Sequence, residues 1–235
     1  VLRNLEMIKK NCSFTKTYTL FEMKKQLKIT YISELNVQPI GFWGDLLTQK
    51  GAIGDIDVVN WKGFPHLPQT SFFVGYSSSA LCIHYKVRGE GLRALFANDH
   101  EPVWQDSCVE FFVKSAEGEG YFNFEVNCIG TALAAYRRSR TDADHFSAEQ
   151  MARVRHFGSL PHAPIDSVGE GQQWWMVEII PFALLGVERA PKSIRCNFYK
   201  CGDNCDKTHF LSWSPIALEA PNFHCPDFFG ELKLM

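Results

Sequence analysis

The strongest constraint on the fold of this chain is a set of short runs in which apolar and polar residues alternate. In the clearest run, residues 121–128, every second position is apolar: Phe122, Phe124, Val126 and Cys128. Successive side chains of a β-strand point to opposite faces of a sheet, so these four residues share one face. The run therefore predicts a strand with one face in the core.

Similar runs recur along the chain and are separated by turn-forming residues. Strands are expected at 27–32, 71–76, 80–87, 108–113, 131–140, 174–180, 194–201, 210–213 and 230–234. The segment 43–57 contains three glycines and is expected to be irregular, and helix is expected only at 147–153 and in one turn after Pro181. The pattern predicts an all-β fold, a single antiparallel, jelly-roll-like β-sandwich with one or two short helices.

No linker or change of composition divides the chain, so we expect one domain over residues 23–235. Residues 1–22 have no clear period and precede Met23, which resembles a translation start, so they are expected to be an extension outside the fold. No signal peptide and no membrane-spanning window are visible. The protein is therefore expected to be cytoplasmic, or secreted with its leader removed.

The charge and the cysteines exclude several classes of function. A net charge of −2 argues against nucleic acid and anionic membranes as partners. Most of the eight cysteines lie in strand-like runs or polar turns and are expected to be reduced thiols. The spacing of Cys201, Cys205 and His209 is tolerated by zinc, but a second pair of ligands is lacking, so no zinc is predicted there.

A candidate binding site begins at Trp104, which precedes the strand 108–113. In that strand Glu110 shares a face with Cys108 and Phe112, opposite to the apolar Val109 and Phe111. A carboxylate in this position is costly unless it has partners or meets a ligand. An aromatic plate beside a hydrogen-bonding acid is suited to a sugar ring, which packs its C–H face on the plate.

A hydrolase remains an alternative. Glu110 and Glu125 belong to adjacent predicted strands and face the same side, as paired carboxylates do in glycoside hydrolases. Motifs of serine hydrolases, phosphate-binding loops and zinc proteases are absent from the sequence.

Three segments together resemble the family 9 carbohydrate-binding modules of the DOMON-like superfamily. They are 104–112 (WQDSCVEFF), 210–214 (FLSWS) and 223–232 (FHCPDFFGEL), in the order and spacing of that family. The resemblance implies a non-catalytic β-sandwich that holds a terminal saccharide between two aromatics. It also implies a role in polysaccharide breakdown, since modules of this family are often attached to xylanases. Mono- or oligosaccharides and a glycoside hydrolase system are thus the expected partners.

The resemblance also assigns residues. Trp104 and Phe223 match the two aromatics, Glu110 matches the acid, and Asn197 and Tyr199 fall at matching polar positions. Glu125 stands where the family often has arginine. Strand parity adds Asn127 to Glu110 and Glu125 on the pocket floor.

No cofactor is certain from the sequence. Structural calcium, common in the family, is a further candidate although no clear calcium loop is visible. Some members of the superfamily bind haem, but no methionine is suitably placed on the matching strands, so haem ranks last.

Overall fold

The computed structural model describes residues 24–116 and 118–235. Its strands are β1 (Gln26–Tyr31), β2 (Ala52–Asp55), β3 (Val58–Val59), β4 (Gln69–Tyr76), β5 (Ala80–Ala94), β6 (Cys108–Lys114), β7 (Tyr121–Asn127), β8 (Ala132–Arg137), β9 (Ala143–His145), β10 (Arg155–Gly158), β11 (Ile165–Pro181), β12 (Ser193–Cys201), β13 (Phe210–Ser212) and β14 (Gly230–Leu234). The helices are α2 (Trp43–Lys50) and α3 (Ala148–Arg153), with 3-10 turns η1 (Ser33–Asn36), η2 (Ile40–Phe42), η3 (Val103–Gln105), η4 (Phe182–Leu185) and η5 (Pro226–Phe228).

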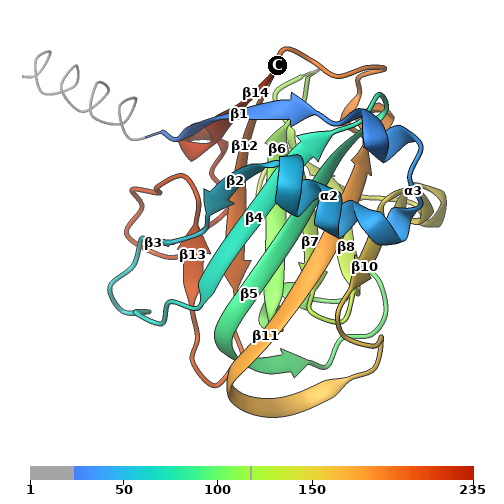
Figure 1. Ribbon diagram of the computed structural model, residues 1–235. Coiled ribbons are helices and arrows are strands. Elements are labelled where there is room, and N and C mark those ends of the chain that lie inside the picture. Colours follow the sequence, from blue (N-terminus) through green and yellow to red (C-terminus); the bar gives the residue numbers. More distant parts are fainter. Residues whose placement is uncertain (1–23, 117) are drawn as a thin grey trace, which may run out of the picture.

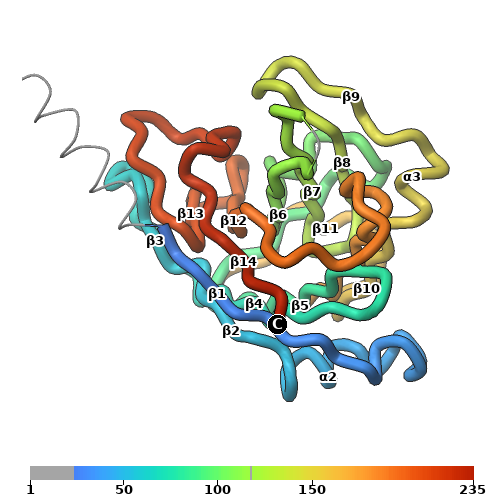
Figure 2. The backbone as a smooth tube through the Cα atoms, turned by 90° about the horizontal axis from the view of Figure 1, so that it is seen from above, coloured from blue at the N-terminus to red at the C-terminus, as the bar shows by residue number. Residues whose placement is uncertain are grey.

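The strands form two layers, seen from the side in Figure 1 and from above in Figure 2. One layer, here called the site sheet, has the order β14-β12-β6-β7-β8-β9, with β13 also paired to β12. The other, the back sheet, has the order β4-β5-β11-β10, with β2 on β4. β1 joins them, because it pairs in parallel with β14 at its start and with β4 at its end, whereas every other pairing in the described part of the chain is antiparallel.

The main core fills the space between the two sheets. Phe72 of β4 stacks on Phe198 of β12 across this space, with ring centroids 3.8 Å apart. Phe124 and Val126 also belong to this core, as the alternation of their run predicts. The predicted β-sandwich is therefore confirmed, and the strand over 131–140 is confirmed as β8.

The helices agree with expectation in two places, whereas α2 and the 3-10 turns η1, η2, η3 and η5 were not expected. α3 starts after Ser147, whose hydroxyl accepts a hydrogen bond from the amide of Gln150 in a capping box, and η4 is the single turn expected after Pro181. The expectation of irregular structure at 43–57 is wrong, because this segment contains α2 and β2. Trp43 and Leu47, one helical turn apart, bury α2 against the outer face of the back sheet.

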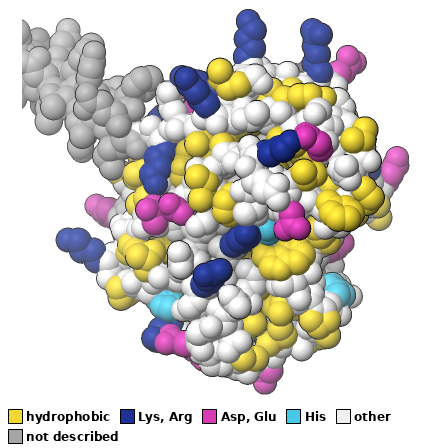
Figure 3. Space-filling view, viewed as in Figure 1, with side chains coloured by type: hydrophobic (Ala, Val, Ile, Leu, Met, Phe, Trp, Pro, Cys, Tyr) yellow, Lys and Arg dark blue, Asp and Glu magenta, His cyan; other side chains and the backbone are white. Residues whose placement is uncertain are grey.

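Figure 3 shows the side of the molecule drawn in Figure 1. Lysine and arginine are interspersed there with aspartate and glutamate, and apolar side chains are scattered among them. Such a face has no extended field of one sign. No helix in the part of the chain that the structure describes is long and apolar enough to cross a membrane. The expected extension, residues 1–22, lies outside the described residues, and the boundary of the domain stays a prediction.

Candidate functional site

The site lies on the outer face of the site sheet, where the alternation of β6 divides its side chains. Val109 and Phe111 enter the main core, whereas Cys108 and Phe112 belong to a second, largely aromatic cluster on the outer face. Glu110 shares this outer face and is almost completely buried. The predicted division of the strand is therefore confirmed.

A cavity of about 330 Å³ opens on this face. Its walls carry aromatic rings beside charged side chains, and they consist of Trp104, Glu110, Glu125, Arg137, Arg140, Cys201, Asp203, Phe210, Pro221, Asn222, Phe223 and His224. In Figure 2 the segment that follows β13 and the β8–β9 hairpin lie on either side of β6, and both segments contribute lining residues to the cavity. The structure thus brings four of the seven predicted site residues to one cavity.

The two predicted aromatics are held in different ways. Trp104 lies in η3 and is half-buried. Its carbonyl accepts a hydrogen bond from the amide of Asp203 at 3.4 Å, and the sulfur of Cys201 also lies 3.4 Å from it. Phe223 is more enclosed, because its ring stacks on Tyr199 with centroids 4.2 Å apart and an interplanar angle of 8°. Both rings line the cavity, but only Trp104 resembles the open plate that the sequence suggests.

Glu110 and Glu125 face each other across β6 and β7, where they are direct partners in the antiparallel register. Oε1 of Glu110 accepts a hydrogen bond from the Cys201 thiol at 2.9 Å, and Oε1 of Glu125 accepts one from the Asn123 amide at 2.8 Å. Burial, together with the charge of Glu125, raises the pKa of Glu110 well above its usual value. Burial likewise raises the pKa of Glu125, to about 7.

Sequence reasoning missed the cationic side of the cavity. Arg137, at the end of β8, is almost completely buried and donates hydrogen bonds to Asn123 Oδ1 and to the carbonyl of Arg140, both at 2.8 Å. Its positive charge lowers the pKa of both carboxyls against the larger effect of burial. The available signal was strand parity, because Arg137 pairs with Tyr121 and so lies on the same face as Asn123 and Glu125.

Asp203 and His224 complete the polar wall. Burial raises the pKa of Asp203 to about 6 and lowers the pKa of His224 to about 3. Nδ1 of His224 lies 2.9 Å from the hydroxyl of Tyr121. Both residues come from loops, so no periodicity in the sequence marks them.

Three predicted site residues do not line the cavity. The side-chain amide of Asn127 forms hydrogen bonds with Phe96, Asp106 and Thr131. The side-chain amide of Asn197 forms hydrogen bonds with both the backbone amide and the carbonyl of Ser214. Tyr199 lies beneath Phe223 and donates its hydroxyl to the Phe223 carbonyl at 3.2 Å. Strand parity places these side chains on the outer face, but loops packed over that face cover them.

The Asp-Ser pair of the signature has a structural role. Asp106 is fully buried, forms an ion pair with Arg93, and accepts hydrogen bonds from the amides of Leu95 and Phe96, both at 3.1 Å. Ser107 accepts a hydrogen bond from the Arg93 amide at 3.1 Å. These contacts tie the start of β6 to the end of β5 and so hold η3, and with it Trp104, in place.

The side chains near the cavity determine which of the expected metal ions they could bind. In the described ranges, one group of three or more histidine, cysteine or acidic side chains is close enough to share an ion, and it consists of Cys108, Glu110 and Cys201. Two thiols do not suit calcium, which takes six to eight oxygen ligands, so this group does not fit the calcium of the family. Cys205 and His209 do not join it. The sulfur of Cys205 lies 3.5 Å from the Ser107 hydroxyl, and His209 lies 2.9 Å from Lys200, which points to the opposite face of β12 from Cys201.

Comparisons with known proteins agree with the fold and the motifs. A family model described as carbohydrate-binding family 9 matches residues 44–234. A structure from Bacteroides uniformis, described as a "putative carbohydrate-binding protein", is 35% identical, with a TM-score of 0.85 over 90% of this chain and 100% of that one. No curated protein matches the chain.

Two solved family 9 modules from Caldicellulosiruptor kristjanssonii share the fold at low identity. The module in complex with glucose is 13% identical, with a TM-score of 0.53 over 90% of this chain and 96% of that one. The module in complex with cellotriose is 12% identical, with a TM-score of 0.55 over 89% and 93%. Since the family model covers most of the chain, the protein belongs to carbohydrate-binding family 9.

Proposed function

We propose that the cavity on the site sheet binds the terminal unit of a saccharide, with Trp104 and Phe223 against the ring and Glu110 and Glu125 on its hydroxyls. The observation that carries this proposal is the meeting of aromatic rings and buried carboxylates in one cavity. A sugar ring needs both, because its C–H faces are apolar and its edge carries hydroxyls.

A free hydrogen-bonding atom supports the proposal. Oε2 of Glu125 is buried and has no hydrogen-bond partner within the described protein. A buried carboxylate oxygen without a partner is costly. If the side chain rotates toward the cavity that Glu125 lines, a sugar hydroxyl that donates to this oxygen would remove the cost.

The size of the cavity supports a small ligand. About 330 Å³ is at the lower end of the range for small-molecule sites, which is about 300–1,000 Å³. The two C. kristjanssonii modules hold glucose and cellotriose. We therefore propose one or two sugar units in the cavity, with the rest of a chain outside it.

We favour binding over glycoside hydrolysis on geometric grounds. Glycosidases place their two carboxylates on opposite sides of the scissile bond. Glu110 and Glu125 stand next to each other on one wall, as direct cross-strand partners. Turnover of chromogenic glycosides that is lost in Glu125→Gln would instead identify a hydrolase.

A role in polysaccharide breakdown follows from the proposed binding mode. A module that holds chain ends can keep a glycoside hydrolase system on its substrate, and xylan is the first polymer to examine. Sedimentation with insoluble xylan or cellulose should then show a capacity that rises with the number of chain ends.

Titration calorimetry with glucose, xylobiose and cellotriose tests the binding proposal directly. Stacking on one ring contributes about 1 kcal/mol, and a hydrogen bond to a charged group about 1.5–3 kcal/mol before ordering costs. These values predict dissociation constants between about 1 μM and 1 mM. Trp104→Ala should weaken binding about fivefold, and Glu125→Gln at least about tenfold.

A matched control is available on the other side of the molecule. Trp175 lies on β11 of the back sheet and is 36% exposed, so Trp175→Ala removes a tryptophan far from the cavity. This variant should bind sugar like the unaltered protein. Equal losses in Trp104→Ala and Trp175→Ala, or full binding by both, would refute the proposed site.

A further inference from the structure

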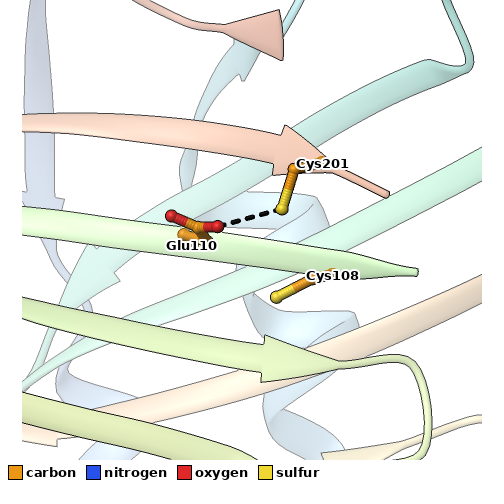
Figure 4. A group of neighbouring side chains, drawn as sticks. All are labelled: Cys108, Glu110 and Cys201. Carbon is orange, nitrogen blue, oxygen red and sulfur yellow. Dashed lines mark hydrogen bonds between the residues drawn. The ribbon is translucent and has the colours of Figure 1, made fainter. Parts of the chain in front are cut away.

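Cys108, Glu110 and Cys201 form a compact group at the wall of the cavity. Cys108 and Glu110 are two positions apart on β6, and Cys201 is the direct partner of Cys108 on β12. One potential ligand atom from each residue lies within 4.8 Å of the other two, and all three side chains are buried (Figure 4). The register of two strands thus brings together two sulfur atoms and one carboxylate oxygen.

We propose that this group binds a zinc ion through both cysteine sulfurs and the Glu110 carboxylate. Zinc is bound in proteins by cysteine at about 2.3 Å and by carboxylate oxygen at about 2.0–2.2 Å, usually in a tetrahedron. Soft thiolate ligands favour zinc over magnesium or calcium. The ligand set therefore fits this ion and does not fit the calcium considered above.

The spacing of the group requires only small movements. In a tetrahedron with these bond lengths two sulfurs are about 3.8 Å apart, and a sulfur and an oxygen about 3.5 Å. The three atoms now lie within 4.8 Å of one another, and the Cys201 sulfur is 2.9 Å from Glu110 Oε1. Changes of about 1 Å or less, within reach of side-chain rotation, would complete the coordination.

The fourth position of the ion faces the cavity. Glu110 and Cys201 both line the cavity, whereas Cys108 does not, so the open side of the group is the side that ligands can reach. Three protein ligands and one open position are the arrangement of zinc sites that accept a water or another small ligand. Glu110 is shared with the proposed sugar site, but the three zinc ligands belong to the protein itself, so zinc binding can be tested without sugar.

Charge and protons balance in this step. Each thiol releases its proton to solvent as its sulfur binds the ion, and the Glu110 carboxyl, where it is protonated, releases its proton as well. The S–H donation from Cys201 to Glu110 is replaced by two bonds to zinc. Two thiolates, a carboxylate and Zn²⁺ leave a net charge of −1. Arg137 and Arg140 line the same cavity and supply positive charge beside the group.

The test uses the whole reduced protein, freed of metal and kept in a thiol-free reductant. Titration with Co²⁺ should produce the near-ultraviolet charge-transfer absorption of cobalt–thiolate bonds, and Zn²⁺ should abolish it at one equivalent. Gel filtration followed by elemental analysis should find one zinc per chain. In the unaltered protein Zn²⁺ should also slow alkylation of Cys108 and Cys201, mapped by mass spectrometry, without slowing that of Cys196.

Variants locate the site. Cys108→Ala and Cys201→Ala should each abolish the cobalt absorption, and Glu110→Gln should weaken zinc binding at least about tenfold, by loss of one ligand. Cys205→Ala is the matched control, because Cys205 is buried outside the group and contacts Ser107, and it should bind as before.

Two outcomes would overturn the proposal. One is a protein that retains no stoichiometric zinc at micromolar concentration and shows no protection of the two thiols. The other is loss of binding in Cys205→Ala with retention in Cys201→Ala. Sugar affinity is not part of any readout, so failure here and failure of the proposed carbohydrate site are distinguishable.

Discussion

Glu110 and Glu125 are direct cross-strand partners, and each side chain is only 3% exposed. Two like charges opposite each other destabilise a sheet, and burial adds a desolvation penalty. The neighbouring groups offset this only in part: Cys201 and Asn123 donate one hydrogen bond each, and Arg137 supplies a positive charge. The pair therefore lowers the stability of the sheet, and its position is better explained by contact with a ligand.

Glu125→Gln should raise the stability of the protein while it weakens sugar binding. The substitution removes one buried charge, and its amide oxygen can still accept the hydrogen bond from Asn123. Urea unfolding at pH 8 should show a gain of about 1 kcal/mol, measured beside calorimetry with glucose. A less stable variant would contradict this account of the pair.

Asp106→Ala should be strongly destabilising. It leaves Arg93 without its ion partner and removes the acceptor of two backbone amides at a fully buried position. A loss of about 3 kcal/mol or more is expected in urea unfolding. Asp144→Ala breaks an exposed ion pair with Arg138 and should cost no more than about 1 kcal/mol; equal costs would mean that Asp106 does not anchor the site.

The two aromatics of the cavity should differ in their effect on stability. Phe223→Ala removes a ring stacked on Tyr199 and should cost about 3 kcal/mol. Trp104→Ala should cost about 1 kcal/mol, because its ring is only half-buried. Denaturant unfolding distinguishes them, and a larger loss for Trp104→Ala would show that this tryptophan is a core residue.

His84 should make the fold sensitive to acid. Burial beneath α2 lowers the pKa of His84 from 6.5 to about 4, although the Gly44 carbonyl lies 2.8 Å from Nδ1. Between these two values the unfolded chain binds a proton that the folded protein does not, so stability present above about pH 6.5 is lost as the pH falls toward 4. Each proton contributes a slope of about 1.4 kcal/mol per pH unit.

His84→Gln tests this assignment. Urea unfolding between pH 7 and pH 4 should show that the free energy of unfolding of the variant depends less steeply on pH. The difference in slope should correspond to about one bound proton. His209 and His224 also have lowered pKa values and retain their contributions. An unchanged slope would contradict the assignment to His84 and point to the other histidines whose pKa is lowered.

The amino-acid sequence alone predicted most of the sandwich. Alternation is a local property, so the sequence predicted the division of β6 and β7 into a core face and an outer face. It also predicted the short helix over 147–153. At 43–57 the three glycines indicate irregular structure, whereas the apolar spacing of Trp43 and Leu47 is that of a helix. That helix is stabilised by packing on the back sheet, a long-range contact that no local pattern contains.

The sequence by itself determined which face of each strand is polar, and with the motifs it identified the family and four residues of the cavity. Only the tertiary structure decided which polar side chains remain accessible. Asn127 and Tyr199 have the right parity, yet loops cover them, whereas Arg137, Asp203 and His224 arrive from other segments. The face to which a strand residue points depends on its neighbours in the sequence. Whether that side chain is accessible depends on the positions of loops that are distant in sequence.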